Sequence, residues 1–162
     1  MKLFKDYLDE ALRDFRDENI QTRFIGDKSH FGPELQSLIK KTEELSADKT
    51  GLVLNIAMNY GGRDELVMAM RSIAGKAAAG EISEEDITAQ LISDELYTSG
   101  QPDPDLIIRP SGEYRTSNFL LWQSAYSEYV FFDNILWPDF TTDDLDSAIE
   151  IYNQRNRRFG GV

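Results

Sequence analysis

Residues 105–140 read DLIIRPSGEYRTSNFLLWQSAYSEYVFFDNILWPDF, and this stretch decides the fold class and the kind of site that we predict. An apolar strand at 106–109 ends in an arginine, and a turn of small residues leads to a second arginine. A Thr-Ser-Asn step, a predicted buried helix at 118–126 and a glutamate follow. This order suits a protein that holds a diphosphate with a divalent metal, because guanidinium groups bind phosphate and carboxylates bind the metal.

Outside this stretch, strands and helices alternate along the chain. The alternation predicts an α/β fold with a mostly parallel sheet flanked by helices, in which ligands bind at the carboxyl ends of the strands. The run LVLNIAM predicts a strand that is covered on both faces. No linker divides the chain, so we predict a single domain over residues 1–162. The other predicted helices lie at 2–18 and 63–79, begin at Pro33 and at Ser83, and run from Thr141 to the arginines at 155–158. A strand is predicted at 20–25 and an extended piece at 129–132.

Composition excludes several classes of function. The 17 basic and 29 acidic residues give a net charge of −12, which should repel nucleic acid and anionic lipid, so any bound anion needs a local cationic cluster. The chain has no cysteine, which excludes disulfides and thiolate chemistry and fits a cytoplasmic protein. No apolar run approaches the roughly 20 residues of a membrane span, and acidic residues interrupt the N-terminal apolar positions, unlike a signal peptide.

The candidate anion site consists of Arg109, Arg115 and Ser117, arranged around the turn Pro110-Ser111-Gly112. Guanidinium groups supply paired hydrogen bonds and stay charged at any working pH, and Ser117 adds a hydroxyl donor. Backbone amides at the start of the predicted helix at 118 would add further donors. The alternative is that both arginines pair with surface acids, which is the default for the spacing alone.

Three other groups of residues have a functional and a structural interpretation. Glu128 is a candidate ligand for Mg²⁺, or a solvated carboxylate at a helix end, which the spacing alone favours. The glycines of NYGGR at 59–63 allow an anion to approach a helix start, or form an ordinary strand-to-helix turn. The arginines at 155–158 suit a helix C-terminus, and the Arg-Phe-Gly-Gly tail that follows would also reach a neighbouring active site. The single histidine, His30, predicts no metal cluster.

Four ordered blocks of sequence resemble the cis-prenyltransferases, the undecaprenyl diphosphate synthase family. They are LNIAMNYGGRDELVMAMR at 54–71, DLIIRPSGEYRTSNFLLWQSAYSE at 105–128, ILWPDF at 135–140 and NRRFGG at 156–161. The resemblance implies a dimeric, Mg²⁺-dependent enzyme that condenses isopentenyl diphosphate onto an allylic diphosphate, usually farnesyl diphosphate. The typical bacterial product is undecaprenyl diphosphate, the precursor of the carrier lipid for cell-wall glycan, and we expect such a product to pass to the membrane.

The resemblance also implies roles for particular residues. Arg109, Arg115 and Ser117 match the positions that bind the isopentenyl diphosphate group. Glu128 matches the glutamate associated with Mg²⁺. Arg158 and Gly160 match an Arg-x-Gly element that contributes to the partner subunit's site.

The chain departs from the family pattern at its beginning. Family members have an Asp-Gly-Asn loop, whose aspartate is the residue most tied to catalysis, and a Ser/Thr-x-Glu-Asn-Trp segment; neither occurs here. Pro110 also stands where threonine is more usual. We therefore assign no catalytic residue in this chain and expect it to be the C-terminal portion of a synthase, inactive alone.

Two alternatives remain open. The first is a natural non-catalytic subunit of a heteromeric cis-prenyltransferase, although such a subunit need not keep the arginines, Ser117 and Glu128. The second is an unrelated α/β module that binds anions, which the four long blocks disfavour.

Overall fold

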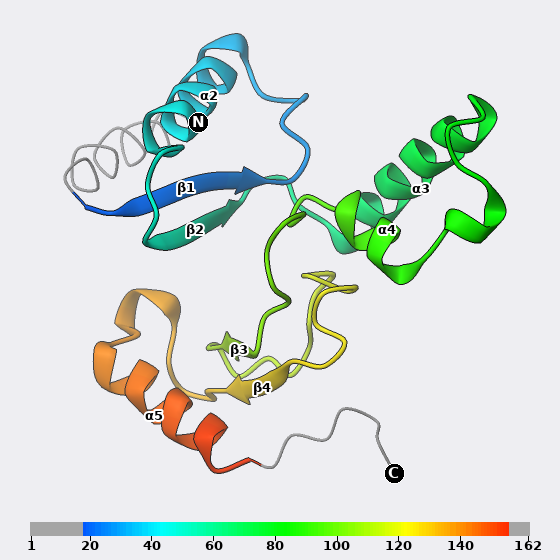
Figure 1. Ribbon diagram of the computed structural model, residues 1–162. Coiled ribbons are helices and arrows are strands. Elements are labelled where there is room, and N and C mark those ends of the chain that lie inside the picture. The colour runs from blue at the N-terminus through cyan, green and yellow to red at the C-terminus, as the bar shows by residue number, and fades with distance from the viewer. Residues whose placement is uncertain (1–17, 156–162) are drawn as a thin grey trace. The chain divides into compact units, whose positions relative to one another are not determined.

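The structure is a computed structural model that describes residues 18–155 (Figure 1). The chain forms two compact units, the first ending at Tyr60 and the second beginning at Gly61. The prediction of a single domain over 1–162 stays a prediction. The predicted helix at 2–18 and the tail with Arg158 and Gly160 lie outside the described residues.

The first unit is a β–α–β arrangement. Strands β1 (Ile20–Ile25) and β2 (Leu52–Ala57) pair in parallel, and helix α2 (Pro33–Ser46) connects them (Figure 1). Pro33 lies in the first turn of α2 as predicted, where its missing amide hydrogen costs nothing. Phe24 of β1 forms a small core with Leu35 and Ile39 of α2.

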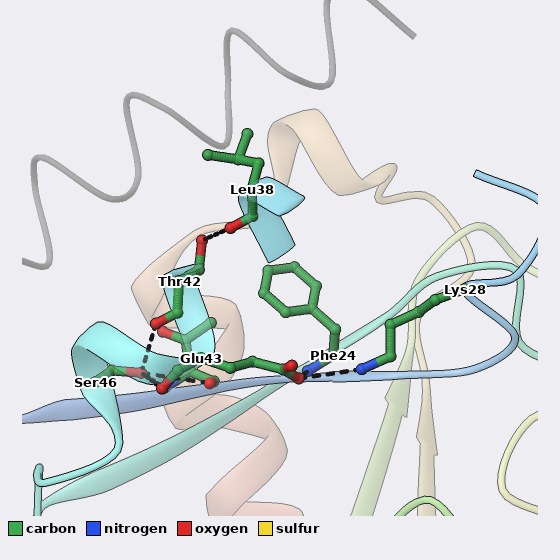
Figure 2. Close-up of polar contacts among 7 residues, drawn as sticks. Phe24, Lys28, Leu38, Thr42, Glu43 and Ser46 are labelled. Carbon is green, nitrogen blue, oxygen red and sulfur yellow. Dashed lines mark hydrogen bonds and ion pairs between the residues drawn. The ribbon is translucent and has the colours of Figure 1, made fainter. Parts of the chain in front are cut away.

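Polar side chains of α2 bind the backbone of β1 (Figure 2). Ser46 Oγ accepts a hydrogen bond from the amide of Thr22 at 2.9 Å, and Glu43 Oε1 accepts one from the amide of Phe24 at 2.8 Å. Lys28 Nζ also reaches Glu43 Oε1 at 3.2 Å. These amides therefore bond to helix side chains instead of to a neighbouring strand, which satisfies polar groups that would otherwise be buried unpaired.

The prediction that the strand at 52–58 is covered on both faces is wrong, because none of its residues is buried. Leu52 is 62% exposed and Val53 is 39% exposed. Among the described residues, β2 pairs only with β1, and α2 packs against β1. An apolar run alone cannot tell a strand inside a wide sheet from a strand at its edge.

The second unit contains a second pair of parallel strands. Strands β3 (Leu106–Arg109) and β4 (Glu128–Phe131) pair in parallel, with Arg109 opposite Phe131, and helix α5 (Thr142–Asn153) packs against β4 (Figure 1). Parallel strands and flanking helices in both units confirm the predicted α/β class. The helical elements of this unit are α3 (Gly62–Ala78), η1 (Glu84–Asp86), α4 (Ala89–Asp94), η2 (Trp137–Asp139) and α5 (Thr142–Asn153).

The helix boundaries follow the signals in the sequence. Gly80 adopts a φ of +74° just beyond α3, a conformation in which glycine has no steric penalty. Capping boxes form at Ser83 and at Thr141, where we predicted helices to begin, although the first opens a short 3-10 helix. α5 ends at Asn153, two residues before Arg155, whereas the prediction carried the helix into the arginines; those at 157 and 158 lie outside the described residues.

The predicted buried helix at 118–126 is also wrong, because these residues form a series of turns. Ser117, Asn118 and Leu120 have φ angles of +49°, +66° and +46°. An L-residue in this left-handed region cannot continue a right-handed helix. None of the apolar side chains of 118–126 is buried, so their spacing does not mark the buried face of a helix.

Candidate functional site

The turn that follows β3 is fixed by backbone hydrogen bonds to the segment after β4. The amide of Ser111 donates to the Ile135 carbonyl at 2.7 Å, and the amide of Gly112 donates to the Phe132 carbonyl at 2.8 Å. Gly112 has a φ of +68°, and a Cβ atom at this position would lie 2.8 Å from the Asp133 carbonyl oxygen. Only glycine satisfies both constraints, so Gly112 is a geometric requirement of this turn.

This turn brings the predicted anion-binding residues together. Arg109 Nη1 donates to the carbonyl oxygen of Arg115 at 2.7 Å, and Arg115 Nε donates to Ser117 Oγ at 3.1 Å. Both guanidinium groups also form ion pairs with Glu113, Arg109 with one carboxylate oxygen and Arg115 with the other. The contact with Arg109, followed by that with Arg115, lowers the pKa of the Glu113 carboxyl below its ordinary value.

A cavity of about 310 Å³ lies against these residues. Its lining combines cationic and hydroxyl groups with an apolar wall. Strand pairing places Ile107 opposite Tyr129 and Arg109 opposite Phe131, and alternate residues of a strand face the same side. An apolar surface therefore continues from the arginine along both strands. The lining residues are Ile107, Ile108, Arg109, Arg115, Thr116, Ser117, Phe119, Tyr129, Phe131 and Trp137.

Chemically, this combination suits a small molecule with an anionic head and a hydrocarbon tail. The volume of the cavity is near the lower limit of ordinary ligand pockets. The guanidinium groups would hold the head through charge-assisted hydrogen bonds, and the aromatic side chains would cover the tail.

Glu128 does not have the environment that we predicted. It begins β4 instead of following a helix, and its Oε2 pairs with Arg155 Nη1 at 2.7 Å. Its side chain is not among those that line the cavity. Within residues 18–155, no group of three or more histidine, cysteine, aspartate or glutamate side chains is placed to hold a metal ion. The role of Glu128 as a Mg²⁺ ligand stays a prediction.

The beginning of α3 is bound to the turn that follows Ser117. The amide of Gly62 donates to the Asn118 carbonyl at 2.7 Å, and the amide of Arg63 donates to Asn118 Oδ1 at 2.9 Å. A Cβ atom at Gly62 would lie 2.8 Å from Leu121 Cγ. The first amides of α3 are therefore already bonded, which favours an ordinary turn over an anion site. Likewise, no helix begins at Asn118, so the helix-start amides that we expected beside Ser117 do not exist.

Sequence reasoning missed two acidic residues. Glu113 stands between the arginines in RPSGEYR, and that position was the signal that could have identified it. Glu65 is only 1% exposed; its Oε1 accepts from the Tyr97 amide at 2.9 Å, and both of its oxygens accept from Gln123 Nε2. No local pattern marks Glu65, because its partners are more than 30 residues away.

Comparison with known proteins identifies the family. A family model described as "Putative undecaprenyl diphosphate synthase" matches residues 1–160. The chain belongs to this family. Curated relatives include the isoprenyl transferases of Rhizobium meliloti (strain 1021), 51% identical, and of Clostridium perfringens (strain 13 / Type A), 47% identical, each aligned over this whole chain. The chain spans 65% and 64% of the length of these two relatives, which is less than two thirds.

Solved structures with similar folds support the same assignment. The lavandulyl diphosphate synthase from Lavandula x intermedia, in complex with dimethylallyl diphosphate, has a TM-score of 0.93 at 37% identity and covers 99% of this chain. A "probable undecaprenyl diphosphate synthase" from Campylobacter jejuni has a TM-score of 0.86 at 31% identity, also over 99% of this chain. The match covers 69% and 72% of those two chains. The predicted synthase-like α/β fold is confirmed. Within the described residues, no helix has the length and apolar character to span a membrane.

We predict that Asn118→Ala destabilises the protein by about 2 kcal/mol, because it removes the acceptor for the Arg63 amide and places alanine at a left-handed position. Asn118→Asp is the matched control, since it keeps an Oδ1 acceptor and a residue type that tolerates this conformation. Urea unfolding of the three proteins measures the difference. An alanine variant as stable as the aspartate variant would show that the Asn118 side chain does not hold the start of α3.

Proposed function

We propose that this chain forms the isopentenyl diphosphate-binding part of a cis-prenyltransferase. The whole enzyme would extend an allylic substrate, farnesyl diphosphate, to undecaprenyl diphosphate for the cell-wall carrier lipid. The observation that carries the proposal is the cavity in which two fixed guanidinium groups adjoin an apolar wall. Membership of the undecaprenyl diphosphate synthase family supports the proposal.

Isopentenyl diphosphate matches the two halves of the cavity lining. Its diphosphate would accept hydrogen bonds from Arg109, Arg115 and the Ser117 hydroxyl. Its five-carbon tail would lie against apolar residues such as Phe119 and Phe131. The related lavandulyl diphosphate synthase was solved with dimethylallyl diphosphate, which also joins five carbons to a diphosphate, and this likeness favours an isoprenyl diphosphate over other anions.

In the proposed reaction, the terminal alkene carbon of isopentenyl diphosphate forms a bond with C1 of the allylic substrate. The allylic diphosphate leaves with the electron pair of the broken C–O bond, and a proton is lost from the isopentenyl unit. The arginine pair would hold the isopentenyl substrate so that its alkene points at the allylic carbon, which lowers the entropic part of the barrier. No residue of this chain is assigned to the proton transfer.

Magnesium would supply electrostatic stabilisation of the diphosphate charges when bound. Mg²⁺ commonly takes one or two carboxylates and completes its shell with water and substrate phosphates, so the single carboxylate of Glu128 fits such a site. Arg155 would have to release Glu128 for this carboxylate to act as a ligand.

The remaining parts of the proposal concern residues and partners outside the described structure. Arg158 and Gly160 would belong to the Arg-x-Gly element that reaches the partner subunit's site in a homodimer. Location in the cytoplasm and passage of the product to the membrane stay predictions.

Replacing both arginines tests the proposed site. We predict that Arg109→Ala/Arg115→Ala weakens isopentenyl diphosphate binding at least about tenfold, because hydrogen bonds to charged groups contribute roughly 1.5–3 kcal/mol each. Calorimetric titration of the purified chain gives the dissociation constants. Arg71→Ala is the control, because Arg71 is exposed on α3 and does not line the cavity. Equal affinity in the double variant would remove both arginines from the site.

A second prediction concerns activity. The purified 162-residue chain should form no polyprenyl product from labelled isopentenyl diphosphate, farnesyl diphosphate and Mg²⁺, because it contains no Asp-Gly-Asn step. A full-length synthase of the family, assayed in parallel, shows that the assay detects product. Long product from this chain alone would mean that the aspartate is dispensable or replaced here.

A further inference from the structure

Glu113 lies behind the arginine pair and does not belong to the cavity wall. Its two carboxylate oxygens each contact a different guanidinium group, that of Arg109 and that of Arg115. Both arginines line the cavity, whereas Glu113 does not. The carboxylate therefore holds the two cations from outside the space that a ligand would occupy.

Among the described residues, each guanidinium group also makes a hydrogen bond besides its ion pair with Glu113. Arg109 Nη1 donates to the Arg115 carbonyl oxygen at 2.7 Å, and Arg115 Nε donates to Ser117 Oγ at 3.1 Å. Glu113 supplies the second contact for each arginine. A planar guanidinium held at two points has a defined orientation, whereas one contact leaves it free to rotate about that bond.

The backbone on both sides of Glu113 is itself fixed. The amide of Gly112 bonds to the Phe132 carbonyl, and the Tyr114 hydroxyl donates to the carboxylate of Asp133. Glu113 is thus carried by a turn that is fixed to the segment after β4. It can transmit that rigidity to the arginines, which would otherwise repel each other as neighbouring like charges.

We infer that Glu113 is a positioning residue that sets the orientation of Arg109 and Arg115 toward the cavity and so favours diphosphate binding. This inference rests on the proposed function, because it takes the arginine pair to be the diphosphate site. It also predicts a change in anion affinity that is opposite in direction to the change expected from charge alone. Loss of a negative charge beside the arginines should strengthen anion binding if charge alone matters, and weaken it if orientation matters.

The test is Glu113→Gln, which keeps the size of the side chain but replaces one carboxylate oxygen with an amide that cannot accept a hydrogen bond. We expect isopentenyl diphosphate affinity to fall about tenfold in calorimetric titration, since two charge-assisted contacts are weakened. Glu150→Gln, on the exposed face of α5, removes the same charge elsewhere and should leave affinity unchanged. Unchanged or tighter binding by Glu113→Gln would overturn the inference.

A readout without ligand separates this inference from the proposed function. In ¹⁵N NMR spectra of the ligand-free chain, the Arg109 and Arg115 guanidinium signals should be dispersed and slow in rotation, and should average in Glu113→Gln but not in Glu150→Gln. Unchanged signals would overturn the inference. If the unsubstituted chain binds no isopentenyl diphosphate, the proposed function fails, and these signals decide only whether Glu113 orients the two arginines. If it binds and needs the arginines but not Glu113, the proposed function stands and the inference fails.

Discussion

Two guanidinium groups lie side by side at the end of β3, and the candidate site depends on how their mutual repulsion is overcome. Arg109 and Arg115 share the carboxylate of Glu113, and each has a second contact, to a backbone carbonyl and to Ser117. Because these cations are already held in place, little further side-chain entropy is lost when an anion binds. In a chain of net charge −12, such a cluster is the means by which a diphosphate could bind at all.

The backbone around this cluster constrains particular residues between 110 and 121. Gly112 is required by its positive φ and by the nearness of Asp133. Asn118, also at a positive φ, places its backbone and side-chain oxygens against the first amides of α3. The segment therefore links β3, the arginine pair and α3 within one unit, and two of the four blocks that carry the family resemblance meet at Asn118.

Much of the fold and part of the site could be predicted from the sequence. The four strands, the parallel arrangement and the capping boxes follow from local patterns, and Arg109, Arg115 and Ser117 do meet. The false helix at 118–126 arose because apolar spacing alone does not distinguish a helix face from a run of turns, while the left-handed residues that stop a helix leave no strong local signal. The bridging role of Glu113 and the burial of Glu65 depend on the geometry of contacts in the folded chain, which a one-dimensional pattern does not contain.

The most direct test of this account is a crystal structure of the chain with isopentenyl diphosphate. The account predicts the diphosphate against Arg109, Arg115 and Ser117, the five-carbon tail along the aromatic side chains of β4, and Glu113 still bound to both arginines. A diphosphate bound elsewhere, or one that displaces Glu113 from the arginines, would contradict it.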